Sequence, residues 1–402
     1  MMADYDLLII GAGIAGLSMA HYAASAGLKT RVLESEQRAG GCLHSHRFGG
    51  ALDGFWLELG AHSSFNSYGN LLAILERIQL LNRLQRRAKV GFRLFAEGAV
   101  HGIPSQLYVS ELLLAPFRLI GMKKTGRSVA DYFGSIVGPR NYAAVFEPAF
   151  SAVICQPAGD FPADSLFRSR PRRKDVPRGF TLSGGLQTIA DSLSRQPGIV
   201  VELGCAAREI RRDGANFVVH TDGGEYAARA LCLATPVAVA AELLRTEFPH
   251  LADPLAQIQT ARVETVGVAA PVAALKLPPL AGLIGRNEAF YSAVSRDTVP
   301  NPAYRGFTFH FRPGVLDEAG KRARMGAALG LPRTAFGPEH TVMKINQLPA
   351  LRVGHDAVIR AVDHALAGSR LALTGNYFTG VAIEDCVTRS LGEFARLRRE
   401  GW

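Results

Sequence analysis

Three glycines near the beginning of the chain have the spacing of a phosphate-binding turn. They follow the apolar run 6–10 and precede an apolar helical pattern. In such a turn the first glycine permits the bend, the second lets backbone approach a pyrophosphate, and the third lets helix and strand pack closely. The helix N-terminus adds free N–H groups and the positive end of a dipole. We predict that this turn binds a dinucleotide diphosphate through Gly11, Gly13, Ile14, Ala15 and Gly16.

An acidic residue ends the next predicted strand. The segment 29–33 reads as a strand and runs into Glu34, followed by Ser35. A carboxylate about 20 residues after the glycines accepts hydrogen bonds from ribose hydroxyls and repels a 2′-phosphate. We therefore expect an unphosphorylated adenine dinucleotide with contacts to Glu34 and Ser35, and NADP is disfavoured.

The following turn, 38–45, narrows the choice of dinucleotide. It contains a second pair of glycines, which indicates that backbone again lies close to a long ligand, beyond its pyrophosphate. FAD is the natural candidate, and a glycine-rich turn in an NAD-binding domain is the alternative. The contacts predicted here are Arg38, Gly40, Gly41 and Cys42.

This turn resembles that of the FAD-dependent protoporphyrinogen oxidase and flavin amine oxidase superfamily. The superfamily has an Arg, two glycines, often another Arg, and a Ser or Thr. This chain departs from the pattern at Cys42, which stands where the second Arg often provides a phosphate contact. The same resemblance extends to the segments 56–65, 128–151, 180–189, 348–355 and 371–386.

The resemblance implies the remaining cofactor contacts. Segment 56–65 would pass the flavin ring, the adenine would lie near 207–210, and 234–235 would end a strand at the dinucleotide. The turn after 371–373 would close the site, with a helix N-terminus facing the flavin where negative charge accumulates on reduction. The implied contacts are Leu59, Gly60, Ala61, His62, Ala207, Ala234, Thr235, Gly375, Asn376, Gly380, Val381 and Ala382.

The expected fold is α/β, with a Rossmann-like FAD-binding domain of the glutathione-reductase type, amine oxidase branch, interleaved with an α+β substrate domain. Helices are expected over 70–81 and 109–124 and strands over 199–203, 216–221 and 226–233. The expected division is 1–66, 180–262 and 346–402 for FAD, 67–179 for a helical substrate part, and 263–345 for the substrate sheet.

The chain carries a formal charge of +10, which favours acidic partners. Such partners include a carboxylated substrate and an anionic membrane surface, whereas no nucleic-acid motif is present and no nucleic-acid partner is expected. The basic segment 168–178 is either an exposed connection or a patch that attracts anionic groups. Segment 109–124 is either an interfacial amphipathic helix or a buried helix of the substrate domain.

Five scattered cysteines, odd in number, indicate a reducing compartment without a disulfide framework. Asp4 and Asp6 precede the apolar N-terminal run, so we do not interpret it as a signal peptide. We expect a cytoplasmic protein, with a peripheral position on the inner membrane face left open. No metal motif is present and no metal site is predicted, and the oligomeric state stays open.

The expected chemistry is removal of hydride from a conjugated or nitrogen-adjacent carbon. No cysteine pair of a flavin disulfide reductase and no second nicotinamide fingerprint is present, so the substrate is the reductant and dioxygen or a quinone the acceptor. The resemblance implies a substrate like protoporphyrinogen or coproporphyrinogen. His62 is a weak candidate for a base, and a hydrogen-bonded loop histidine is the alternative. Amine oxidases of the superfamily place a lysine near strand 263–275, where only Lys276 stands, at its end.

Two other functions stay open from the sequence. One is a flavin amine oxidase or carotenoid-type desaturase on the same fold, and the other is a flavin-retaining binding protein without catalysis. The aromatic residues that alternate with polar ones over 290–311 fit strands that line a cavity and fit core packing equally well.

Overall fold

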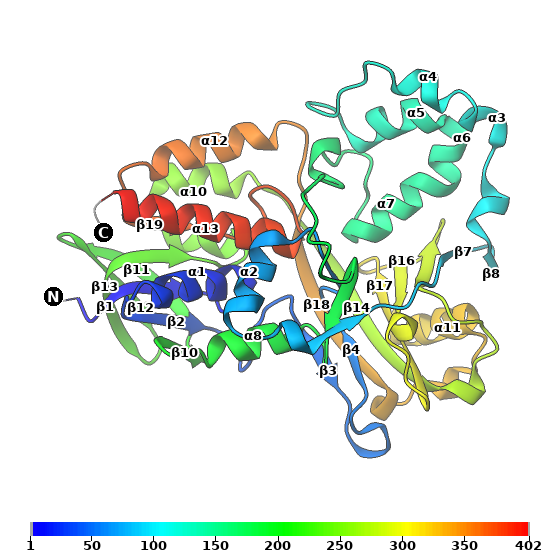
Figure 1. The fold of residues 1–402 in the computed structure, drawn as a ribbon, viewed down its shortest axis with the longest axis horizontal. Coiled ribbons are helices and arrows are strands. Elements are labelled where there is room, and N and C mark those ends of the chain that lie inside the picture. Colours follow the sequence, from blue (N-terminus) through cyan, green and yellow to red (C-terminus); the bar gives the residue numbers. More distant parts are fainter. Residues whose placement is uncertain (1–2, 401–402) are drawn as a thin grey trace.

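The computed structural model describes residues 3–400, and its largest elements are two sheets that lie side by side (Figure 1). The first is a seven-stranded sheet with a parallel centre and an antiparallel hairpin at one edge. Residues 7–10 of its central strand are apolar and buried on both faces of the sheet. The strands are β10 (Ile199–Leu203), β2 (Thr30–Glu34), β1 (Tyr5–Ile10), β13 (Gly224–Leu233), β12 (Asn216–Thr221) and β11 (Ala207–Asp213), with β19 (Leu371–Leu373) beside β13.

Helices cover both faces of this sheet. Leu7 and Ile9 of β1 pack with one group of helices, whereas Leu8 and Ile10 pack with the other, because successive side chains of a strand point to opposite faces. The first group is α1 (Ile14–Ser25), α2 (Gly69–Arg77), α8 (Gln187–Ser194) and α13 (Ile383–Arg399). The second group is α9 (Val237–Leu244), α10 (Pro249–Ala256) and α12 (His355–Leu366).

The second sheet is mostly antiparallel. Its aromatic side chains Phe290, Phe307, Phe309 and Phe311 are fully buried and pack against α11 (Glu318–Leu329), so the aromatic alternation reflects core packing. The polar residues between them point to the opposite face, toward the first domain. The strands, in order, are β18 (Thr341–Pro349), β14 (Thr260–Pro271), β17 (Tyr304–Phe311), β16 (Phe290–Ser295), β15 (Gly282–Gly285), β7 (Phe92–Ala96) and β8 (Ala99–His101).

Short strands and helices complete the chain. Two small sheets connect the domains, and five short helices form a cap at one end of the second sheet (Figure 1). The small sheets contain β3 (Ser45–Arg47) with β4 (Trp56–Glu58), and β5 (Ser64–Phe65) with β9 (Gly179–Leu182) and β6 (Leu84–Arg86). The cap helices are α3 (Val109–Leu112), α4 (Ala115–Leu119), α5 (Ser135–Val137), α6 (Pro139–Asn141) and α7 (Glu147–Ile154).

Two sequence-based expectations about elements were wrong, and one strand was missed. The helix expected to run to residue 81 ends at Arg77, and Gln79 adopts a left-handed conformation just beyond it. The segment 109–124 is two short helices, since Pro116 begins α4 and cannot continue α3. Strand β11 was missed, because its exposed sequence shows no apolar alternation.

The position of α2 bears on the expected domain division. Its apolar side chains Leu71, Leu72 and Ile74 pack into the same core as α1 and α13. These contacts favour a boundary after α2 instead of at 66/67, and the division as a whole stays a prediction.

Candidate active site

The glycine turn connects β1 to α1. Gly11 has a φ of +101°, and a β-carbon there would lie 2.7 Å from the carbonyl oxygen of Ala234. A β-carbon at Gly16 would collide with the carbonyl oxygen of Gly11, because α1 starts directly against the turn. A β-carbon at Gly13, in contrast, would meet nothing within 4 Å. The structure thus leaves open space in front of Gly13, where the first N–H groups of α1 are available to an anion.

Glu34 is buried beside this turn. Its Oε2 accepts a hydrogen bond from the N–H of Ala12 at 2.7 Å, and its Oε1 accepts one from the N–H of Glu36 at 2.9 Å. These bonds hold the carboxylate at the end of β2, next to the start of α1. The N–H of Cys205 donates to the carbonyl of Glu34, so the segment leading to Ala207 reaches the same end of the sheet.

The second glycine pair lies against the first turn. The N–H of Gly40 donates to the carbonyl of Ala12 at 2.7 Å, and Gly40 pairs with Gly13 in an isolated bridge. A β-carbon on Gly41 would lie 3.3 Å from the Cα of Gly13. The two glycine-rich turns, 11–16 and 38–41, therefore form one backbone surface.

The segment expected beside the flavin ring meets the same surface. The carbonyl of Cys42 accepts a hydrogen bond from the N–H of Ala61 at 2.8 Å, and a β-carbon on Gly60 would collide with that carbonyl. The carbonyl of Leu59 accepts from the Nδ2 of Asn346 at 2.9 Å, which ties this segment to β18.

The C-terminal helix also reaches the first turn. The hydroxyl of Ser390 on α13 donates to the carbonyl of Ala15 at 2.8 Å. At the start of α13, Asp385 accepts from the N–H of Ala382 at 3.2 Å and pairs with Arg170 at 2.5 Å. The C-terminal helix and the N-terminal glycine turn therefore lie against each other.

The remaining residues predicted to contact the cofactor do not all lie beside the glycine turn. Gly375 is buried, with a φ of +154°, and follows β19, which pairs with β13. A β-carbon on Gly380 would lie 2.5 Å from Oδ2 of Asp385, so this turn is tightly closed. Val381 packs with the core of the helical cap instead of with α1. Asn376 is half-buried, and Ser35 is exposed.

Two buried polar atoms at the site fit a ligand that is rich in hydroxyl and phosphate groups. Among the residues that the structure describes, Oγ1 of Thr235 and Nδ1 of His44 are buried without a hydrogen-bond partner. Buried polar groups of folded proteins are normally paired, so these atoms point to a missing partner. Burial, together with the charges of Arg38 and Lys344, lowers the pKa of His44 to about 3, which keeps this ring neutral.

A chain of polar side chains crosses from the first domain to the second sheet. Nε2 of His62 lies 2.9 Å from Nε2 of His310. On its other side, His310 Nδ1 lies 3.3 Å from the hydroxyl of Thr265 on β14. Asn346 donates its Nδ2 to that hydroxyl at 2.8 Å. Sequence analysis singled out His62 but missed His310, whose only signal was its polar position in the alternating strand β17.

The donors fix the direction of this chain. Because Asn346 donates to Thr265, the threonine hydroxyl is free to donate to His310 Nδ1, and His310 Nε2–H then donates to His62. His62 therefore carries its proton on Nδ1. Burial lowers the pKa of His310 to about 4 and holds the pKa of His62 well below its ordinary value. At neutral pH both rings are neutral. His62 accepts from His310 through Nε2 and keeps its Nδ1–H as a donor.

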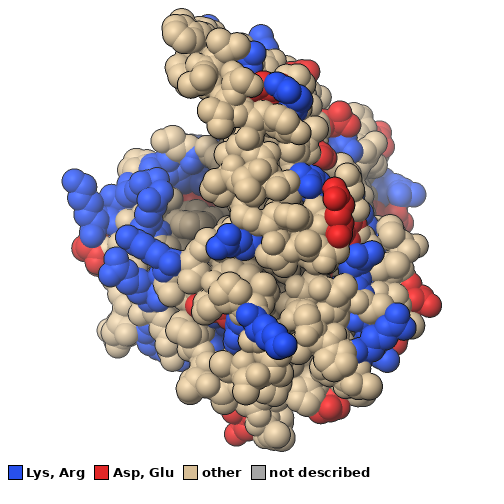
Figure 2. All heavy atoms as spheres, turned by 90° about the vertical axis from the view of Figure 1, so that its right-hand side faces the viewer, with Lys and Arg blue, Asp and Glu red and all other residues tan. Residues whose placement is uncertain are grey.

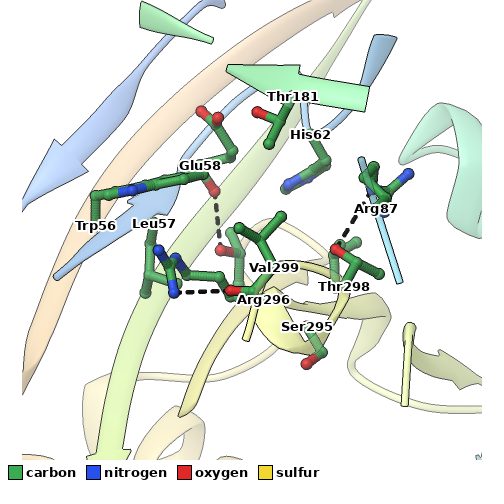
Figure 3. Close-up of a pocket in the computed structure, with 12 residues that line it drawn as sticks. Trp56, Leu57, Glu58, His62, Arg87, Thr181, Ser295, Arg296, Thr298 and Val299 are labelled. Carbon is green, nitrogen blue, oxygen red and sulfur yellow. Dashed lines mark hydrogen bonds between the residues drawn. The ribbon is translucent and has the colours of Figure 1, made fainter. Parts of the chain in front are cut away.

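His62 lines an enclosed pocket between the domains (Figure 3). The pocket has a volume of about 30 Å³, enough for about one water molecule. Arg296 lies in its wall with the guanidinium 4.4 Å from the ring centre of Trp56. Burial lowers the pKa of Arg296 to about 10, so this residue is a cation at neutral pH.

Glu58 is a buried carboxyl group in the same wall. It accepts hydrogen bonds from the N–H of Leu186 and the hydroxyl of Ser45, both at 2.8 Å. Burial nevertheless dominates and raises the pKa of Glu58 to about 7. This group therefore titrates close to neutral pH, directly beside the pocket.

A wider groove opens next to the pocket. It has a volume of about 440 Å³ and is lined by Arg86, Arg87, Lys89 and Pro300 together with one alanine. Arg87 belongs to the walls of both spaces, so the groove and the pocket adjoin. Figure 2, which views the molecule from the side of the second sheet, shows a hollow bordered by Lys and Arg side chains.

The basic segment 168–178 is mainly an exposed connection. Arg170 pairs with Asp385, and Arg173 pairs with Asp175 and Glu76, so these two arginines hold the segment against the first domain. The other basic side chains of the segment are exposed: Arg168, Arg172, Lys174 and Arg178.

Residues 3–400 contain neither a membrane-spanning helix nor a cluster of metal ligands. No helix there has the length and apolar character needed to cross a bilayer. No three His, Cys, Asp or Glu side chains in this part of the chain are grouped so that they could hold a metal ion.

An α/β dinucleotide-type domain that meets a second sheet at a glycine-lined site defines an oxidoreductase of the two-domain flavoprotein class. The family of flavin-containing amine oxidoreductases matches residues 14–303, and the chain belongs to this family. The protein is therefore a flavin-dependent oxidoreductase.

The chain is also similar in sequence to individual proteins. The coproporphyrinogen III oxidase of Propionibacterium freudenreichii subsp. freudenreichii is 30% identical over 229 residues, which are 52% of this chain and 42% of that protein. A 15-cis-phytoene desaturase of Narcissus pseudonarcissus is 38% identical over 80 residues, 20% of this chain and 14% of the desaturase. The chain thus spans less than half the length of these two relatives.

A solved structure matches the whole fold. A candidate protoporphyrinogen oxidase from Exiguobacterium sp. 255-15 superimposes with a TM-score of 0.81 over 100% of both chains, at 19% identity. At this identity the likeness shows the fold, including the parts on either side of residues 14–303.

Proposed function

We propose that the flavin is FAD and that it lies extended from Glu34, across Gly13 and Gly41, to the segment around Gly60. The observation that carries this proposal is the convergence of both chain ends on one backbone surface, with open space in front of Gly13. Ribose hydroxyls would reach Glu34, and the diphosphate would face the N-terminus of α1. The unpartnered hydroxyl of Thr235 would then gain a hydrogen-bond partner.

We further propose that the substrate is an anionic molecule of the porphyrinogen type, which becomes conjugated on oxidation. The pocket beside His62 is too small for such a molecule, so its bulk would lie in the adjoining open groove, which has a volume of about 440 Å³. Arg86, Arg87 and Lys89 would attract its carboxylates. The similarity to a coproporphyrinogen III oxidase supports this substrate class.

The chemistry that a bound flavin would supply is acceptance of hydride, with dioxygen or a quinone as the final acceptor. The chain's own residues orient the substrate and exclude water. His62, held by His310, would donate a hydrogen bond to the substrate edge that enters the pocket. Glu58, with its pKa of about 7, would in its ionised form accept the proton that the oxidised substrate releases.

The test is the visible spectrum of the purified protein, followed by mixing with candidate reductants. We expect a yellow protein whose released cofactor is FAD, and porphyrin fluorescence that grows when coproporphyrinogen or protoporphyrinogen is supplied under air. Release of FMN, or a colourless protein that does not take up FAD, would contradict the cofactor proposal. Bleaching by an amine, with no reaction of either porphyrinogen, would move the assignment to an amine oxidase.

We also propose that the helical cap contacts an anionic membrane surface. The α3–α4 segment exposes large apolar side chains, with Leu113, Phe117 and Ile120 each 70% exposed or more. Lys123 and Arg127 follow directly and are exposed too. This combination suits a membrane, which has an apolar interior beneath anionic head groups. In Figure 2 the upper end of the molecule, where Figure 1 places α4, is mostly uncharged with Lys and Arg beside it.

Sedimentation with lipid vesicles tests this contact. We expect binding to vesicles that contain phosphatidylglycerol, and loss of binding in the double variant Phe117→Ser/Ile120→Ser. The matched control is Val315→Ser, which removes a 55% exposed apolar side chain from another part of the surface. Equal sedimentation of the double variant and the control would rule out the cap as the contact.

A further inference from the structure

The turn at Gly41 has a positive charge beside it that comes from a distant strand. Lys344 lies on β18, directly opposite Thr265 of β14 in the antiparallel register. Its Nζ donates to the carbonyl of Gly41 at 3.2 Å. Because Gly41 lies against Gly13, the ammonium group is close to the open space in front of α1.

Both terminal nitrogens of the basic residue within the turn, Arg38, are bonded to protein oxygens. Nη1 of Arg38 donates to the carbonyls of Ala39 and Leu43 and to the side chain of Gln187, at 2.7–2.9 Å. Its Nη2 donates to the carbonyl of Gly41 at 2.8 Å. Arg38 therefore closes the turn, and its donors are directed at protein oxygens. The other position in the turn where the superfamily often has an arginine is Cys42, which carries no charge.

Lys344 has no carboxylate partner of its own. Over residues 3–400 no ion pair involves its ammonium, and the nearby Glu34 and Glu36 act on it only from a distance. Burial, reinforced by Arg38, lowers the pKa of Lys344 below its ordinary value. A half-buried cation without an anionic partner is unfavourable, and an anion bound in front of Gly13 would relieve this cost.

We infer that Lys344 binds the diphosphate of the cofactor and supplies the charge that this chain lacks at Cys42. The inference rests on the proposed binding of FAD. The ammonium would act as a point charge on the phosphate oxygens while it also holds Gly41 in place. The second sheet thereby takes part in cofactor binding, in addition to forming the substrate side of the site.

The experiment measures FAD affinity of the flavin-free protein at several salt concentrations. Lys344→Met removes the charge, and Lys344→Gln removes it but keeps a donor for Gly41. We expect the dissociation constant of both variants to rise roughly tenfold or more, as for loss of one charge-assisted hydrogen bond. The affinity should also depend less on salt than in the unchanged protein. Thermal melting without flavin shows whether each variant is folded.

Three further variants separate a charge effect from a packing effect. Lys276→Met removes one charge from an exposed position beyond β14 and should leave the affinity unchanged. In the double variant Cys42→Arg/Lys344→Met, the arginine at position 42 should restore most of the affinity and its salt dependence. Lys344→Arg should stay within a few-fold of the unchanged protein.

Several outcomes would overturn the inference. One is an unchanged FAD affinity in folded Lys344→Met and Lys344→Gln. Another is a weakened affinity whose salt dependence is unaltered and that Cys42→Arg does not restore. A third is an unchanged affinity with a shifted midpoint potential of the bound flavin, which would place Lys344 at the ring instead. If the unchanged protein itself binds no FAD, the proposed function fails first, and this inference fails with it.

Discussion

The two sides of the site are built in different ways. The cofactor side consists of backbone from short turns, and its key residues, Gly13 and Gly41, act by having no side chain. The substrate side consists of side chains, and its His62–His310 pair joins residues 248 positions apart in the sequence. The first side is therefore specified by local sequence, whereas the second depends on the register of the long strands β14, β17 and β18.

The first prediction concerns two glycines in the first turn of the cofactor side. Gly16→Ala places a methyl group against the carbonyl of Gly11, so we expect a loss of roughly 3 kcal/mol in the free energy of unfolding. Gly13→Ala meets no protein atom within 4 Å, so the flavin-free protein should keep its stability to within about 0.5 kcal/mol. Denaturant unfolding without flavin measures both.

The same pair of variants distinguishes packing from ligand contact. If the space in front of Gly13 belongs to the diphosphate, Gly13→Ala should weaken FAD binding roughly tenfold or more in spite of its normal stability. Flavin titration measures this affinity. A Gly13→Ala protein with unchanged FAD affinity would show that the space is not occupied by the cofactor.

The second prediction concerns Glu58 on the substrate side. Its pKa is raised to about 7 in the folded protein, so the folded state binds its proton more tightly than the unfolded state does. The associated stability is fully present below about pH 4.5 and is lost as the pH rises through about 7. A shift of this size corresponds to roughly 3–4 kcal/mol. Glu58→Gln should abolish this part of the pH dependence.

Denaturant unfolding at pH 5, 6, 7 and 8 checks this expectation. The stability of the unchanged protein relative to Glu58→Gln should fall across this range and then level off. Gln can still accept from Leu186 and can donate to the hydroxyl of Ser45, so the variant should fold. Parallel stability curves for the two proteins would mean that Glu58 is ionised in the folded state throughout.

The third prediction tests whether the histidine pair belongs to the reaction or to the fold. His62→Phe removes the donor at the pocket, and we expect flavin reduction by the substrate to slow tenfold to a hundredfold. FAD affinity should change little, because Leu59 and Ala61 contact neighbouring segments through backbone groups. Stopped-flow measurement of flavin bleaching gives the rate.

A matched variant removes the other member of the pair. His310→Asn keeps a polar group beside Thr265 but shortens the reach to His62, so the rate should fall by less than in His62→Phe. Because both rings stay neutral near pH 7, the rate in the unchanged protein should show no titration of these histidines between pH 6 and 8. A larger fall in this rate in His310→Asn than in His62→Phe would mean that His310, and not His62, contributes more to the reaction.

The contrast between the cofactor side and the substrate side explains which parts of the site could be predicted from the sequence. β1, the turn and the start of α1 at Ile14 agree with expectation, because their glycines and apolar runs are contiguous. His310 and Lys344 were missed, since only strand register brings them to Thr265. Local pattern gives the face of a strand on which a residue lies, but not which strands become neighbours.

The last prediction uses two hydroxyl groups, one on each side of the site. Oγ1 of Thr235 and Oγ1 of Thr181 are both buried, and neither has a partner among the described residues. Thr→Val at either position removes an unpaired polar atom at nearly constant volume, so the flavin-free protein should be unchanged or more stable by up to about 1 kcal/mol. Denaturant unfolding measures this effect.

Ligand binding should then separate the two threonines. Thr235 lies beside the glycine turn, so Thr235→Val should weaken FAD binding several-fold through loss of one hydrogen bond. Thr181 lines the enclosed pocket, so Thr181→Val should leave FAD affinity unchanged and alter only the substrate concentration needed for half-maximal flavin reduction (Figure 3). If Thr181→Val weakens FAD binding as much as Thr235→Val does, the pocket is part of the cofactor site, and the division between the two sides fails there.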